Sequence, residues 1–158
     1  MLNPPCTTFL AVALLLGACS AAAETAAGTI VVGDPHVREV LPGQSNSASF
    51  MTLENVSDQD HALRGAESPS AQAVELHTHT MQDGMLRMRP LDQVPLPARE
   101  TVHFEPGGLH LMWIGLAQPL RAGQEVPLTL VFEDGSRLEL RVPVREIEMP
   151  AMHQRSGM

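Results

Sequence analysis

Apolar and polar residues alternate along several short segments of this chain, as they do in β-strands that are buried on one face only. The segments at residues 47–55, 73–79, 109–114 and 138–144 show this alternation most clearly. Pro and Gly recur between them, and signals for helix ends are weak throughout the sequence. The pattern therefore predicts an all-β domain.

Turn signals predict how the first strands connect. A strand region at residues 29–40 is expected to break at the Gly-Asp-Pro sequence of residues 33–35. Further along, the polar segment 57–60 separates two apolar runs, 47–55 and 61–66. This arrangement predicts a hairpin between those two runs.

The strand at residues 73–79 carries the first candidate functional side chains. Its apolar residues fall on one face, while His77 and His79 fall on the other. The sequence Gln-Asp-Gly at 82–84 is a strong turn signal. It returns the chain into residues 85–88, which we expect to pair beside the strand that carries His77.

A proline-containing loop at residues 90–97 precedes the second strand of interest, 109–114. There His110 and Met112 lie two positions apart on the face opposite the apolar residues. Side chains at this spacing leave the same face about 7 Å apart at the backbone, so both can reach one ion. The last segment, 138–144, alternates as expected for an edge strand or a half-solvated strand.

Length and charge exclude some functions. The chain has 158 residues and a formal net charge of −8, which suits one domain of ordinary size. All ten basic residues are Arg, and they are spread between Arg38 and Arg155 without forming a block. This distribution argues against nucleic acid as a partner.

Residues 1–23 form a segment of a different kind. An apolar run at 9–16, too short to span a bilayer, is followed by small residues, which is typical of an export signal. Ala21-Ala22-Ala23 suits a soluble-protein signal peptidase, whereas Leu16-Gly17-Ala18-Cys19 resembles a bacterial lipobox. We therefore expect a periplasmic or otherwise extracytoplasmic protein, which contacts the membrane only if Cys19 is lipidated.

Cysteine usage narrows the chemistry of any metal site. The only two cysteines, Cys6 and Cys19, lie in or at the edge of the export segment. The predicted domain, residues 28–146, therefore offers neither a disulfide nor a thiolate ligand. A site for a soft metal in this domain must use Met and His.

Histidine and methionine are concentrated in the predicted hairpin. Of the nine Met and seven His in the chain, five lie there: His77, His79, Met81, Met85 and Met88. Thioether sulfur is a soft ligand and imidazole a borderline one, so this set suits Cu(I) far better than Mg²⁺ or Ca²⁺, which prefer oxygen. With Met88 returned alongside His77, the pair on 109–114 completes a set of four side chains that could converge on one ion.

The spacing of these four residues carries a family resemblance. His77 and Met88 are separated by ten residues, Met88 and His110 by twenty-one, and His110 and Met112 by one. This is the H-x10-M-x21-H-x-M signature of the PCuAC copper chaperones, which the chain resembles over residues 28–144. Neighbouring phrases agree with it, among them Val74-Glu75-Leu76-His77, Met88-Arg89-Pro90 and Pro106-Gly107-Gly108-Leu109.

The resemblance implies a fold, a cargo and partners. The expected fold is a cupredoxin-like Greek-key β-sandwich, and the expected metal ligands are His77, Met88, His110 and Met112. The implied function is a Cu(I) chaperone that binds one ion and delivers it to the copper sites of cytochrome c oxidase. Its implied partners are the copper-bearing subunit of that oxidase and a Sco-type thiol copper protein.

Three other classes of function can be compared with this one. A periplasmic copper buffer or resistance protein would use the same residues, and the sequence does not separate it from a chaperone. An electron-transfer cupredoxin needs a cysteine thiolate, which the domain lacks. An enzyme is not expected, and no catalytic residue is predicted, because neither a catalytic carboxylate pair nor a nucleophile with its base accompanies the ligand set.

The remaining His and Met residues are not expected to be main ligands of the metal. His79, Met81 and Met85 are expected to be solvated neighbours of the site, with His79 as an alternate or fifth ligand. Three histidines match no ligand spacing and are interpreted as surface or boundary residues: His36, His61 and His103. Residues 147–158 are expected to form a flexible tail, which either captures copper weakly or is inert, through Met149, Met152, His153 and Met158.

Overall fold

The structure is a computed structural model that describes residues 24–146. The expected export signal and the expected tail lie outside the described residues. Within residues 24–146, no helix is long and apolar enough to cross a membrane. The described elements are one helical turn and ten strands: α1 (Ala26–Thr29), β1 (Ile30–Arg38), β2 (Ser47–Asn55), β3 (His61–Glu67), β4 (Ala71–Gln82), β5 (Met85–Pro90), β6 (Val94–Leu96), β7 (Thr101–Phe104), β8 (His110–Leu116), β9 (Glu125–Phe132) and β10 (Arg137–Arg145).

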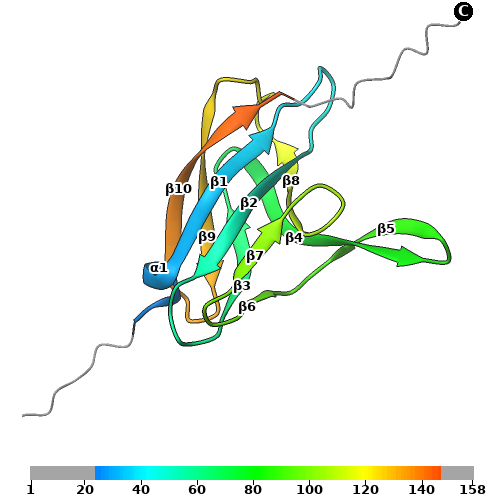
Figure 1. Cartoon of the computed structure of the whole chain (residues 1–158). Coiled ribbons are helices and arrows are strands. Elements are labelled where there is room, and N and C mark those ends of the chain that lie inside the picture. The colour runs from blue at the N-terminus through cyan, green and yellow to red at the C-terminus, as the bar shows by residue number, and fades with distance from the viewer. Residues whose placement is uncertain (1–23, 147–158) are drawn as a thin grey trace, which may run out of the picture.

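The ten strands form one hydrogen-bonded sheet that folds over on itself. Its main path runs β5-β4-β8-β2-β1-β10-β9-β3-β6, and β7 pairs with β2 beside this path. β3 also pairs with β4, where Ala66 lies opposite Val74, and this contact closes the sheet into a sandwich (Figure 1). β1 and β10 run parallel. Most strands that are neighbours in this path are far apart in the sequence. The chain segments that connect consecutive strands therefore cross from one layer of the sandwich to the other.

The core lies between the layers and is filled by the apolar face of each alternating strand. Leu53, Leu111 and Trp113 are fully buried, as are Leu128 and Leu130 of β9. Burial of a side chain of this size contributes about 1.5–3 kcal/mol to stability. The strands predicted at 47–55 and 109–114 are confirmed, with their apolar residues turned inward.

The predicted hairpin between residues 47–55 and 61–66 is wrong. Both strands exist, but β2 pairs with β1, β7 and β8, whereas β3 pairs with β9, β6 and β4. The polar turn between them carries the chain from one layer to the other. Asn55, which is fully buried, fixes this crossing because its side-chain amide donates to the carbonyl oxygens of Gln59 at 2.7 Å and Leu96 at 2.8 Å.

Three smaller expectations are also corrected. The Gly-Asp-Pro sequence does not break the first strand, since β1 continues through it with a bulge between Gly33 and His36. The proline-containing loop at 90–97 includes the short strand β6, which pairs with β3. β10 is not an edge strand, because it lies between β1 and β9. It is half-solvated, which was the other expectation, since Val142 and Val144 are buried while Arg137, Glu139 and Arg141 are exposed.

The predicted hairpin at residues 73–88 is confirmed, and it projects from the sandwich. β4 and β5 pair from His77 and Pro90 out to Gln82 and Met85, and Figure 1 shows this segment, residues 77–90, extending away from the body as an arm. Its turn has φ values of +53° at Asp83 and +76° at Gly84. Two such residues in the left-handed region make a type I′ turn, which matches the twist of a two-residue hairpin.

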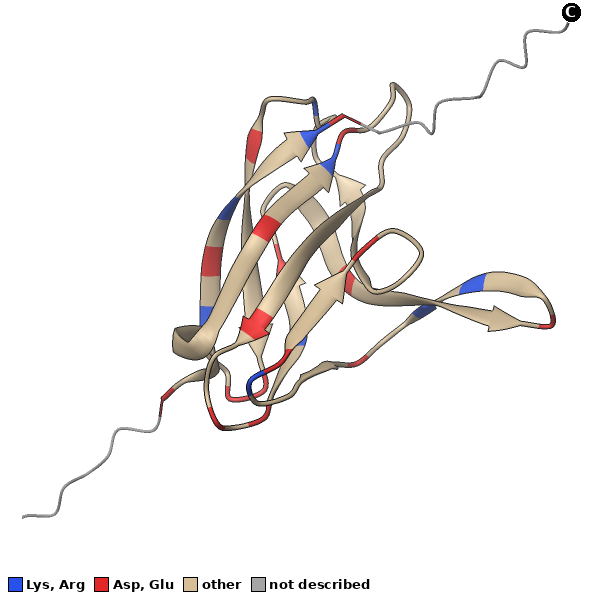
Figure 2. Cartoon of the chain, viewed as in Figure 1, with Lys and Arg blue, Asp and Glu red and all other residues tan. Residues whose placement is uncertain are grey.

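The two faces of the arm differ in chemistry. Met88 and His79 lie opposite each other on one face, whereas Arg87 pairs with Thr80 and Arg89 with Thr78 on the other. Figure 2 shows the basic positions of the arm on β5 and an acidic one at its turn. Four large apolar side chains of the arm are exposed to solvent: Met81, Met85, Leu86 and Met88.

Candidate metal centre

Three adjacent strands position the candidate ligands on one face of the sheet. β8 lies beside β4, so that His77 pairs with His110 and Glu75 with Met112. β5 continues the same sheet on the other side of β4, where Met88 pairs with His79. Because side chains alternate across a strand, all of these residues leave the face opposite the buried Leu111 and Trp113.

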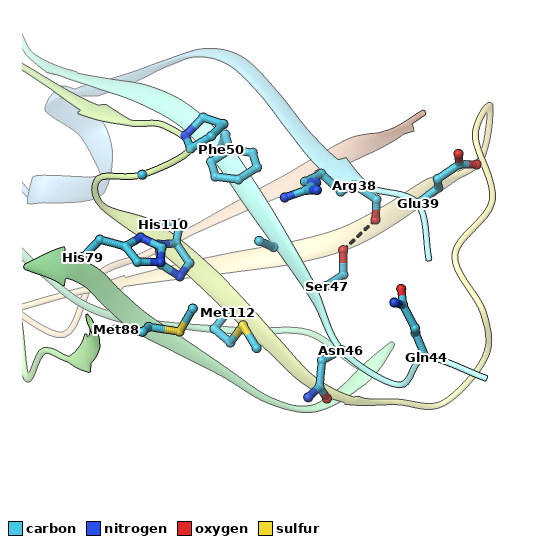
Figure 3. A pocket seen from close by; sticks show the side chains of 13 residues that line it. Arg38, Glu39, Gln44, Asn46, Ser47, Phe50, His79, Met88, His110 and Met112 are labelled. Atoms are coloured by element: carbon cyan, nitrogen blue, oxygen red, sulfur yellow. Dashed lines mark hydrogen bonds between the residues drawn. The ribbon is translucent and has the colours of Figure 1, made fainter. Parts of the chain in front are cut away.

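Four of these side chains line one open pocket. His79, Met88, His110 and Met112 border it, and Phe50 of β2 forms part of its wall. Figure 3 shows the two imidazoles beside each other and the two thioether side chains close below them. The structure thus brings Met88, His110 and Met112 together, as the sequence predicted, but it places His79 rather than His77 among the residues that line the pocket.

His110 is held in one orientation by its neighbours. It is only 3% exposed, and its ring stacks on that of His79 at a centroid distance of 4.9 Å. Nδ1 lies 3.1 Å from the carbonyl oxygen of Gly108. Since a carbonyl only accepts, Nδ1 carries the proton in the neutral ring, which leaves the Nε2 lone pair free for a metal.

His77 lies beside this pocket and is tied to its own strand. Its ring centroid is 5.9 Å from that of His110, and its Nε2 lies 2.9 Å from the Glu75 carboxylate. A carboxylate that accepts from one ring nitrogen is a common way to orient a histidine whose other nitrogen binds a metal.

Two buried ring nitrogens have no hydrogen-bond partner. Among the described residues, the only buried side-chain nitrogen or oxygen atoms without a partner are Nδ1 of His77 and Nδ1 of His79. Leaving such an atom unsatisfied costs about 1–3 kcal/mol, and proteins rarely accept this cost without a reason. Both atoms belong to the candidate centre, where a metal ion would satisfy them.

The donor set of the centre favours a soft ion. Within residues 24–146, no three or more His, Cys, Asp or Glu side chains are grouped so as to hold a metal. The pocket itself offers two imidazoles, together with the thioethers of Met88 and Met112. Thioether and imidazole donors together fit Cu(I) and do not fit Mg²⁺ or Ca²⁺.

Comparison with known proteins places the chain in a family. The family described as "Putative lipoprotein LpqE-like" matches residues 30–144, which include every strand that contributes to the pocket. The chain belongs to the LpqE-like family. Two relatives match this LpqE-like chain over aligned segments of similar length. A protein of Leifsonia xyli subsp. xyli described as a lipoprotein is 35% identical over 105 residues, and an uncharacterized protein of Rickettsia prowazekii is 30% identical over 101 residues.

These matches cover 66% and 63% of the LpqE-like chain, and 63% and 56% of the two relatives. The chain thus spans less than two thirds of the length of either one.

Two solved structures similar to the LpqE-like chain contain copper. The copper-bound PCuAC domain from PmoF2 is 25% identical with a TM-score of 0.65, over 78% of this chain and 97% of that one. Copper(I)-bound DR1885 of Deinococcus radiodurans is 35% identical with a TM-score of 0.59, over 74% of this chain and 78% of that one. The resemblance to the PCuAC family and the cupredoxin-like β-sandwich, both inferred from the sequence, are confirmed.

The strand register of the arm in the LpqE-like chain shows that the predicted neighbour of Met88 is wrong. Met88 was expected beside His77, but it pairs with His79, and His77 pairs with Pro90. The cause is the two-residue loop, because residues paired across it are equidistant from the Asp83-Gly84 turn. His79 was expected only as an alternate or fifth ligand, although counting outward from this turn pairs it with Met88.

Three further histidines of the described part of the LpqE-like chain, His36, His61 and His103, lie outside the pocket. His36 on β1 is partly buried and His103 on β7 is exposed. Both agree with the interpretation that these histidines are surface or boundary residues. That interpretation is wrong for His61, which is buried and has its Nδ1 2.8 Å from the Glu133 carboxylate. His110 was expected on an outward face but is also buried, because Phe50 and His79 cover its ring.

The metal-free LpqE-like chain is expected to lose stability as the pH falls below the usual pKa of histidine, because His110 is buried. Burial lowers the pKa of His110 below its usual 6.5, and the nearby His79 and His77 lower it further, against the effect of the Gly108 carbonyl. Above pH 6.5 the ring is neutral in both the folded and the unfolded chain. Below pH 6.5 the unfolded chain binds the proton first, so the free energy of unfolding falls until the lowered folded pKa is reached.

Chemical denaturation of the wild type and of a His110→Asn variant at pH 7.5 and pH 5.5 measures this contribution. The other titratable side chains are the same in both proteins, so the comparison isolates His110. We expect a larger loss at pH 5.5 in the wild type than in the variant. An equal loss in both proteins would contradict the effect of burial on this ring.

Proposed function

We propose that this chain is an extracytoplasmic Cu(I) chaperone, which binds one Cu(I) with imidazole and thioether ligands and passes it to the copper sites of cytochrome c oxidase. The observation that carries this proposal is the convergence of Met88, Met112 and His110 at one open pocket, beside two imidazole nitrogens that lack partners. The motif assigns His77, Met88, His110 and Met112 as the ligands. Copper-bound relatives of the same fold support copper as the cargo.

The position of the pocket suits transfer of the ion. Met88 is 44% exposed and lies on the arm, so a partner can approach the ion from that side. Thioethers are neutral ligands and do not have to lose a proton when they bind or release copper. Ligands of an acceptor can therefore replace those of the chaperone one at a time.

The acceptor and the thiol partner are part of the proposal. The copper-bearing subunit of cytochrome c oxidase is proposed as the acceptor, and a Sco-type thiol protein is proposed to work beside the chaperone. Export through residues 1–23 agrees with the description of the Leifsonia xyli relative and of the family as lipoproteins. Attachment through Cys19 would keep the chaperone beside a membrane-bound acceptor.

A direct transfer experiment tests the proposal. The purified chain is loaded with one equivalent of Cu(I) and mixed with the metal-free copper domain of an oxidase, and both proteins are assayed for copper after separation. We expect copper to move to the oxidase domain from the wild type. The matched control is the Met112→Ala, His110→Ala double variant, which should neither retain nor deliver the ion.

The result also separates the proposed function from its alternatives. Tight binding of Cu(I) without transfer would point to a buffer or resistance protein. Stoichiometric Cu(I) binding by the double variant would overturn the site itself. Electron transfer is disfavoured, since blue-copper sites use a cysteine thiolate and no cysteine lies between residues 24 and 146.

A further inference from the structure

We propose that the outer part of the arm is the docking surface for the protein that accepts the copper ion. The surface is formed by Met81 and Leu86, which lie beyond the candidate ligand Met88 on the same face of the arm. The partner that fits it presents apolar side chains with acidic residues at their margin. This inference rests on the proposed function, and it adds residues that belong neither to the ligand motif nor to the lining of the pocket.

Exposed apolar side chains are concentrated on the arm. In the part of the chain that the structure describes, seven large apolar side chains are exposed, and four of them lie within residues 81–88. Met81 is 68% exposed and Leu86 is 57% exposed. Single exposed apolar residues are ordinary on a protein surface, whereas several side by side typically mark a site that meets a partner.

The register of the arm places this apolar surface next to the metal pocket. Met81 pairs with Leu86, and the next pair on the same face is His79 with Met88. Side chains two positions apart on a strand leave one face about 7 Å apart. The apolar surface therefore continues outward from Met88, so a partner that covers it also reaches the exposed thioether at the open side of the pocket.

The backbone of the arm is available for contact as well. β5 lies at the end of the strand order, and all six of its residues are exposed. Within residues 24–146, β4 is the one strand that pairs with it. The outer edge of β5 can therefore accept a strand of the partner, which adds backbone hydrogen bonds to the apolar contact.

Charge favours an acidic partner over a second copy of this chain. Residues 77–90 carry Arg87, Arg89 and Asp83, a net charge of +1 from two arginines and one aspartate, although the whole chain has a net charge of −8. Arg87 forms no ion pair within residues 24–146. Figure 2 shows these basic positions on β5. Charges at the rim of an interface steer complementary partners and repel like ones, so two such basic arms disfavour contact with each other.

The test compares the full-length wild type with three variants. The Met81→Ser, Leu86→Ser double variant removes the apolar surface, and Arg87→Glu reverses one charge at its margin. The matched control is the Val31→Ser, Val56→Ser double variant, because these side chains are 50% and 41% exposed and lie away from the arm. Each protein is loaded with one equivalent of Cu(I), and the rate of transfer to the metal-free copper domain of an oxidase is measured. A Cu(I) chelator measures the affinity of each protein for the ion.

We expect the arm double variant to bind Cu(I) as tightly as the wild type and to transfer it at least about tenfold more slowly, since apolar anchors dominate the stability of an interface. Arg87→Glu should also slow transfer and should weaken the dependence of the rate on salt. The control should behave as the wild type does. Wild-type affinity for Cu(I) shows that the variants are folded. Transfer at the wild-type rate by the arm double variant would overturn the inference.

Docking is also measured without copper, which separates this inference from the proposed function. NMR of the metal-free wild type is recorded while the metal-free oxidase domain is added, and we expect the amide resonances of residues 78–89 to shift first. If they shift but copper does not move, the docking surface stands and the proposed function fails. If copper moves while these resonances stay fixed, the function stands and the docking surface is wrong. A dimer of the wild type, or binding to phosphatidylglycerol vesicles, that the arm double variant loses would assign the surface to a second copy or to lipid and would overturn the inference.

Discussion

Replacing His110 with alanine is expected to lower the affinity for Cu(I) by more than about 100-fold. Loss of a residue that only orients a ligand typically costs 10–100-fold in metal affinity, and loss of the ligand itself should cost more. His110 is the most buried of the candidate ligands, and its Nδ1 is held by Gly108, which leaves Nε2 free to bind a metal. Competition titration with a Cu(I) chelator measures the change.

A second buried histidine provides the control for this experiment. His61 is 9% exposed and contacts Glu133, away from the pocket residues. His61→Ala should destabilise the protein without changing its affinity for Cu(I). The Met112→Leu variant removes the thioether at nearly constant volume, and it should weaken binding without loss of stability. Wild-type affinity in His110→Ala would contradict the assignment of this ligand.

Replacing Trp113 with alanine is expected to destabilise the fold by about 3–5 kcal/mol, which is the usual cost of truncating a large aromatic side chain in a core. Trp113 is fully buried, and its ring N–H donates to the hydroxyl of Ser49 at 2.9 Å. The substitution removes the ring and also leaves that hydroxyl without its donor. Chemical denaturation followed by far-ultraviolet circular dichroism measures the loss.

The Trp113→Phe variant separates the two contributions. It keeps most of the apolar volume but loses the hydrogen bond to Ser49, for which we expect a cost of about 1–3 kcal/mol. Since Trp113 neighbours Met112 in β8, a folded Trp113→Phe protein should still bind Cu(I). A loss below 1 kcal/mol in Trp113→Ala would show that the core collapses around the missing ring.

Local features of the fold could be predicted from the sequence because they depend on neighbouring residues. The alternation in β2 and β8 follows from the period of two in a strand, and the turn at Asp83-Gly84 follows from the preference of these residues for positive φ. The side of the strand on which His77, His110 and Met112 lie was predicted for the same reason. Which ligands bind copper stays a prediction.

Features that depend on strands distant in sequence could not be predicted in this way. The pairing of β2 with β8, rather than with β3, is decided by packing between layers. The burial of His110 depends on Phe50, which comes from another strand. The motif spacing identified residues of the site, but it did not reveal that His79 rather than His77 lines the pocket.

The two-residue turn of the arm restricts how this protein can change in length. Inserting or deleting one residue between His79 and Met88 would turn the β5 side chains over, because faces alternate at every position. Met88 would then leave the pocket face, and an arginine, Arg87 or Arg89, would take its place. A cation in that position repels the very ion that the thioether attracts. A single insertion or deletion that shifts this register would convert a copper-binding face into one that excludes copper.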